Sequence, residues 1–246
     1  MRLRNEREET PDVGDTVGLL VACSLFGDSS VPIASNEVNE VIVASLYCGP
    51  QTECFTKAGY GRCMRALTGR WISQTQAALA DDVLLIAMQR SIPEGAIVAR
   101  RQLDASTETR VLALQCLSRF GNEADVPSVS KLLNDESIFC EFPDQGAIGL
   151  PRDDIREEYM PPPGLQRQKL PTEERAMIVR VNDVALAVCM TLGSEDLSKV
   201  FPKYQPSATN ALQVLDCAFA SDGQEYHKLA IARWKKEHPQ FADKAN

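Results

Sequence analysis

Hydrophobic residues recur along most of this chain with the 3.6-residue spacing of amphipathic α-helices. In one such segment Val38, Val41, Ile42 and Leu46 fall on a single face. The spacing predicts helices over Asp12–Phe26, Asn36–Tyr47, Arg62–Ile72 and Gln76–Gln89, and a short helix between Pro93 and Leu103. Strand patterns are weak, because no clean alternation and no Asn-Gly or Asp-Gly turn between apolar runs is present. The pattern therefore predicts an all-α fold.

The clearest unit is a predicted helix pair over residues 105–135. Its first half has one apolar face, starts at Ser106 or Thr107 as the capping residue, and ends at Gly121. Its second half carries Pro127 in the first helical turn, where the missing N–H costs nothing. Neither helix can bury its apolar stripe alone, so the pair must stack on neighbouring elements.

This unit resembles a HEAT repeat. The matching positions are Arg110, Ala113, Leu114, Leu117, Gly121, Asp125, Val126, Pro127, Leu132, Leu133 and Asp135. Aligning Gly193 with Gly121 sets residues 184–187 against 112–115, which gives a second copy of the first helix. The offset between the two glycines exceeds the HEAT period of about 40–47 residues, and a Pro/Gly-rich insert at 141–171 accounts for the excess. The resemblance implies a right-handed α-solenoid of HEAT-like helix pairs.

More narrowly, the chain is similar to HEAT-repeat domain proteins of planctomycete-type bacteria, through Asp12–Phe26, Leu84–Arg101 and Val181–Gly193. That group brings no known reaction, so the resemblance bears on the fold. It implies structural roles for Arg110, Gly121, Asp125, Pro127, Asp135, Asp183 and Gly193. In such repeats, the arginine at the position of Arg110 ties neighbouring repeats together through an acidic residue.

These patterns divide the chain into six parts. They are a charged tail (1–11), an N-terminal helical region (12–104), the HEAT-like repeat (105–140), the insert (141–171), C-terminal HEAT-like helices (172–238) and a second tail (239–246).

The insert at 141–171 is the most unusual segment, with six prolines, three glycines and an acidic cluster. Pro161, Pro162 and Pro163 are expected to form an extended polyproline turn, which suits an aromatic groove on a partner. Together with Tyr159 they are the candidate partner-binding residues of this segment. The alternative is an insert draped over the surface that buries only a few apolar side chains. The acidic cluster lacks the ordered oxygen ligands of a calcium loop and is interpreted as a solvated charge run.

The net charge of -8 and a pI near 4.9 argue against a mainly electrostatic nucleic-acid binder. Residues 57–119 nevertheless carry nine basic against five acidic side chains. This distribution is interpreted first as a set of solvated helix faces, and the alternative is a surface that steers an acidic partner. In a stacked solenoid, arginines at similar positions of successive helices line one groove. Arg90, Arg100, Arg101, Arg110 and Arg119 are such candidates, of which Arg100 and Arg101 are the candidate partner-binding residues.

No constellation of catalytic or metal-binding residues stands out. Cys48, Cys54 and Cys63 lack the spacing of a structural zinc site. His227 lies on a helix face and His238 near its end, and no nucleophile motif accompanies either. The Gly-Tyr-Gly-Arg sequence at 59–62 lacks a Walker lysine and predicts a tight helix–helix turn rather than a phosphate cradle. We therefore expect no catalytic residue, no metal and no cofactor.

Eight scattered cysteines, several within apolar helical patterns, favour a reducing compartment and a cytoplasmic protein. A start assigned too late would hide an export signal and make the protein exported or membrane-tethered. No run of about 20 apolar residues predicts a membrane span.

The sequence predicts a non-catalytic scaffold or adaptor whose partner is another protein. The alternatives are a HEAT-like nucleic-acid-binding module using the arginine-rich middle, and a HEAT-like lyase or cofactor chaperone. The oligomeric state does not follow from the sequence.

Overall fold

The computed structural model describes residues 16–21, 36–47, 51–56, 60–74, 79–143, 176–201, 204 and 212–241. The predicted tail 1–11 and the candidate residues Tyr159 and Pro161–Pro163 lie outside these ranges. The chain divides into two compact units, Met1–Val98 and Ala99–Asn246.

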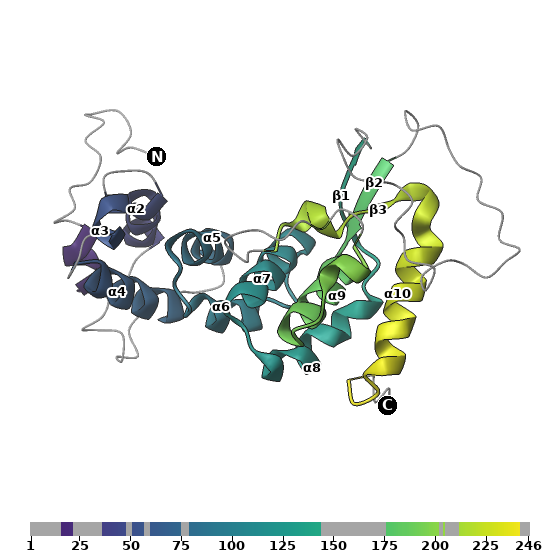
Figure 1. The fold of residues 1–246 in the computed structure, drawn as a ribbon. Coiled ribbons are helices and arrows are strands. Elements are labelled where there is room, and N and C mark those ends of the chain that lie inside the picture. Colours follow the sequence, from purple (N-terminus) through teal and green to yellow (C-terminus); the bar gives the residue numbers. More distant parts are fainter. Residues whose placement is uncertain are drawn as a thin grey trace, which may run out of the picture. The chain divides into compact units, whose positions relative to one another are not determined.

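The N-terminal unit is built from short helices (Figure 1). After a helix over residues 16–21 come α2 (Asn36–Tyr47), α3 (Gln51–Thr56), α4 (Tyr60–Gln74), α5 (Ala80–Arg90) and the start of α6 (Gly95–Arg101). The Trp71 indole N–H of α4 donates to the Asn39 amide oxygen of α2 at 2.9 Å. Arg90 at the end of α5 donates to the carbonyl oxygen of Leu46 at 2.6 Å. These bonds join α4 and α5 to α2 around a core of buried apolar residues.

A tight junction joins α3 to α4. Gly61 lies so close to the Phe55 carbonyl oxygen that a Cβ atom there would overlap it. The Arg65 guanidinium donates to the same oxygen at 2.7 Å and so caps the end of α3. Tyr60–Arg62 thus form the start of α4 and Gly61 packs against the end of α3, whereas Gly59 and the predicted helix–helix turn lie outside the described residues.

The C-terminal unit is organised around α9 (Val181–Leu192), in which every residue from Val181 to Met190 is buried. Its neighbours are α7 (Thr107–Phe120), α8 (Val126–Val129), the 3₁₀ helix η3 (Ser130–Asn134) and, through His227, α10 (Gln224–Glu237). The 3₁₀ helix η2 (Glu123–Asp125) leads into α8. Figure 1 shows α7, α8 and α9 side by side, and contacts join α9 to α7, α8 and η3. A helix that is apolar all round must be covered on all sides, and these neighbours supply that cover.

The predicted all-α class is wrong in one respect, because the C-terminal unit contains a small antiparallel sheet. Its strands β1 (Ile138–Pro143), β2 (Ala176–Arg180) and β3 (Phe219–Ala220) follow that order across the sheet. A bulge interrupts the β1–β2 ladder between Ile138 and Cys140. The described part of the chain is otherwise mostly helical, with 3₁₀ turns at Leu197–Lys199, Val214–Cys217 and Ser221–Gly223. The α-solenoid arrangement stays a prediction.

The helix predictions match the structure closely where it describes the chain. The predicted 36–47, 62–72, 76–89 and 93–103 correspond to α2, α4, α5 and α6, and of 12–26 the structure describes 16–21 as helical. The two aligned glycines follow α7 and α9 directly, as the repeat alignment predicted.

The predicted insert begins inside β1, and residues 239–241 of the predicted tail form a turn after α10. Among the described helices, none combines the length and apolar character that a membrane span requires.

Candidate functional site

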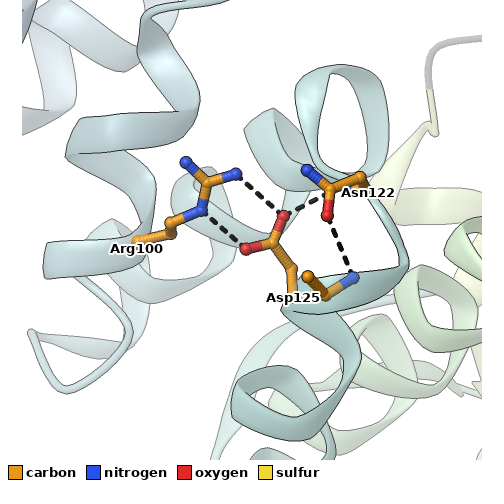
Figure 2. A network of polar contacts seen from close by, with 4 residues as sticks. Arg100, Asn122 and Asp125 are labelled. Atoms are coloured by element: carbon orange, nitrogen blue, oxygen red, sulfur yellow. Dashed lines mark hydrogen bonds and ion pairs between the residues drawn. The ribbon is translucent and has the colours of Figure 1, made fainter.

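One polar network joins the end of α6 to the start of α8 (Figure 2). Arg100 donates from Nε and Nη2 to the two carboxylate oxygens of Asp125 at 2.6 and 3.0 Å. The Asn122 N–H donates to the same carboxylate at 3.0 Å, while the Asn122 side chain accepts from the Ala124 N–H at 2.9 Å. This reciprocal arrangement is a capping box, and it satisfies the N–H groups of Asn122 and Ala124 at this helix start.

The charges of this network support each other. Hydrogen bonds from Arg100 hold the pKa of the Asp125 carboxyl below its usual range, although burial opposes the effect, and the Asn122 N–H adds to it. The same bond raises the pKa of Arg100. Asp125 keeps only 8% of its side chain exposed, against 42% for Arg100. Asp125 is therefore ionised at neutral pH and fixes the orientation of the partly exposed arginine.

A second network joins the start of α7 to the start of α9. Arg110 forms an ion pair with Asp135 and also donates to the Ala105 carbonyl oxygen at 2.7 Å. The Asp135 carbonyl oxygen accepts from the Asn182 N–H at 3.0 Å, in the first turn of α9. Burial alone would raise the pKa of Asp135, but the hydroxyl and N–H of Ser137, together with Arg110, hold it below its usual range. Arg110 thus ties α7 to Asp135, whose backbone in turn bonds to the start of α9. Asp135 lies in the same predicted repeat as Arg110, so the tie between neighbouring repeats that the resemblance implied stays a prediction.

The other structural positions named from the sequence lie at element boundaries. Gly121 and Gly193 follow α7 and α9 as C-cap residues, and Pro127 occupies the first turn of α8. Arg101 is exposed at the end of α6, so its partner-binding role stays a prediction. Arg90, Arg100 and Arg110 all have internal hydrogen-bond partners, which use part of the donor capacity that a shared arginine groove would need.

A buried His–Asp pair connects α9 to α10 and was not foreseen from the sequence. The Nδ1 atom of His227 lies 2.8 Å from Oδ1 of Asp183, and these side chains are 2% and 0% exposed. The other Asp183 oxygen accepts from the Arg180 N–H at 3.0 Å, and the Arg180 guanidinium lies 3.9 Å away. Since a carboxylate only accepts, the geometry assigns the ring proton to Nδ1 of His227. The pair is fully enclosed and docks α10 on the core.

The cysteine thiols of this unit are poor nucleophiles. Burial raises the pKa of Cys116 to about 12. Burial also raises the pKa of Cys217 well above its usual value, and the nearby carboxylates of Asp183 and Asp216 add to the rise. Because the thiolate is the reactive form, these groups stay protonated and inert at neutral pH. Within the described parts of the chain, no three His, Cys, Asp or Glu side chains gather as a group that could hold a metal ion.

The base of the proline-rich segment is the remaining candidate site. Pro143, the last residue of β1, pairs with Ala176, the first residue of β2. The segment 144–175 therefore leaves and rejoins the sheet at directly opposed positions. β2 runs without a break into α9, and its residues from Met177 to Arg180 are buried. The segment therefore ends on a strand that continues into the most enclosed helix of the unit, and it begins on a strand that pairs with that same strand.

Comparison with known protein families, with curated proteins and with solved structures found no significant match. For the Arg100–Asn122–Asp125 network the sequence does carry a signal, because the Asn122-x-x-Asp125 spacing has the pattern of a capping box. The His227–Asp183 pair has no such signal, since the two residues lie 44 positions apart.

Proposed function

We propose that this chain is a protein-interaction scaffold in which the helical C-terminal unit holds segment 144–175 as its partner-binding element. The observation that carries the proposal is the pairing of Pro143 with Ala176 at the base of that segment. A binding loop whose two ends are fixed together loses less conformational entropy when it binds than a free chain of equal length.

The composition of the segment supports a protein partner. Tyr159 and Pro161–Pro163 combine an aromatic ring with a run of prolines, and such segments dock in aromatic-lined grooves as extended polyproline helices. The acidic cluster Asp153, Asp154, Glu157 and Glu158 lies in the same segment. Arg152 and Arg156 lie between and beside these acidic residues, so the cluster is of mixed sign and only modestly acidic. A small excess of negative charge beside a docking motif mainly raises the association rate with a basic partner. The proposal thus places the recognition chemistry in the segment rather than in the arginines.

The test is a variant in which residues 144–175 are replaced by Asn-Gly. Two opposed strand residues are the natural ends of a two-residue hairpin turn, so the β1–β2 ladder is preserved. Circular dichroism first checks that the helical content is unchanged. Intact and shortened chains are then used for quantitative co-purification from the native host, and any enriched protein is purified for direct titration.

Two matched variants keep the segment length and separate its two chemistries. The first replaces Tyr159 and Pro161–Pro163 by serine or alanine, and the second replaces the four acidic residues by their amides. We expect the first variant to weaken the purified partner's affinity at least tenfold. The second should mainly lower the association rate and its salt dependence. Equal affinity of the partner for the intact and the Asn-Gly chains would refute the proposal.

Arg101→Ala tests in the same assay whether that exposed arginine contributes to the partner's affinity.

A further inference from the structure

We draw no further inference here: the strongest candidate, the exposed basic face of α4 that carries Tyr60, Arg62 and Arg65, supports no proposal because nothing in the structure shows what covers it.

Discussion

Asp183 and His227 meet inside the C-terminal unit without access to solvent, with both side chains almost completely enclosed. Removing one partner of such a pair leaves the other buried and unsatisfied. We expect Asp183→Ala to lower the free energy of unfolding of this unit by about 3–5 kcal/mol. Urea denaturation followed through Trp234, in a Trp71→Phe background, measures the change.

The control is Asp104→Ala, because Asp104 is exposed in the turn between α6 and α7. Its substitution should change the free energy of unfolding by no more than about 0.5 kcal/mol. A loss below about 1 kcal/mol for Asp183→Ala would show that the buried pair contributes little to the docking of α10.

The Arg100–Asp125 ion pair makes a prediction about pH. The pKa of Asp125 is depressed in the folded chain, chiefly by the hydrogen bonds from Arg100. Its contribution is therefore complete above the pKa of an unfolded aspartate, about 3.9, and is lost as pH falls through the lower folded-state pKa. Arg100 is partly exposed, so solvent screening limits the expected loss in Asp125→Asn to about 1 kcal/mol at pH 7.

Urea unfolding at a series of pH values from 7 to 3 measures this effect. The difference in free energy of unfolding between wild type and Asp125→Asn should stay constant down to about pH 4 and shrink below it. Asp104→Asn serves as the matched control and should show no such difference at any pH. A difference that grows on acidification would contradict the assigned ion pair.

Between elements, the α3–α4 junction depends on the absence of one side chain. A Cβ on Gly61 would overlap the carbonyl oxygen of Phe55, which belongs to rigid backbone. We expect Gly61→Ala to destabilise the N-terminal unit by about 1–3 kcal/mol, the usual effect of forcing extra atoms into close packing. Gly18 is the control, because a Cβ there meets no atom within 4 Å and alanine favours helix. Trp71 emission in Trp234→Phe variants reports both changes, and equal effects would contradict the close approach.

The helices and strands also differ in how far the sequence could predict them. Helices of 11 to 15 residues, such as α2, α4, α5 and α7, carry enough periodic positions to be found from the sequence. The sheet was missed because β3 has two residues and β1 pairs with β2 across the whole of segment 144–175. Strand pairing at that separation depends on tertiary packing, which overrides local preference.

The polar networks likewise divide into a local one that the sequence indicates and long-range ones that it does not. The capping box at Asn122 is local and follows from residue spacing. Arg110 was assigned a structural role through the resemblance, although its partner Asp135 emerged only from the structure. The pairs His227–Asp183 and His238–Glu195 join residues distant in sequence that single-sequence patterns cannot connect.

For the molecule as a whole, segment 144–175 has two possible energetic roles, and one measurement separates them. If its only ordered attachment is the Pro143–Ala176 base, replacing it by Asn-Gly removes loop-closure entropy and raises the free energy of unfolding by about 2 kcal/mol. If it instead buries apolar side chains such as Ile148 and Leu150 on the surface, each lost contact costs about 1.5–3 kcal/mol and the sign reverses. Urea unfolding through Trp234 in the Trp71→Phe background gives the sign directly, with a Gly/Ser segment of equal length as control. We expect stabilisation by Asn-Gly and no change with the Gly/Ser segment, because a binding element held only at its base contributes nothing to the core it is attached to.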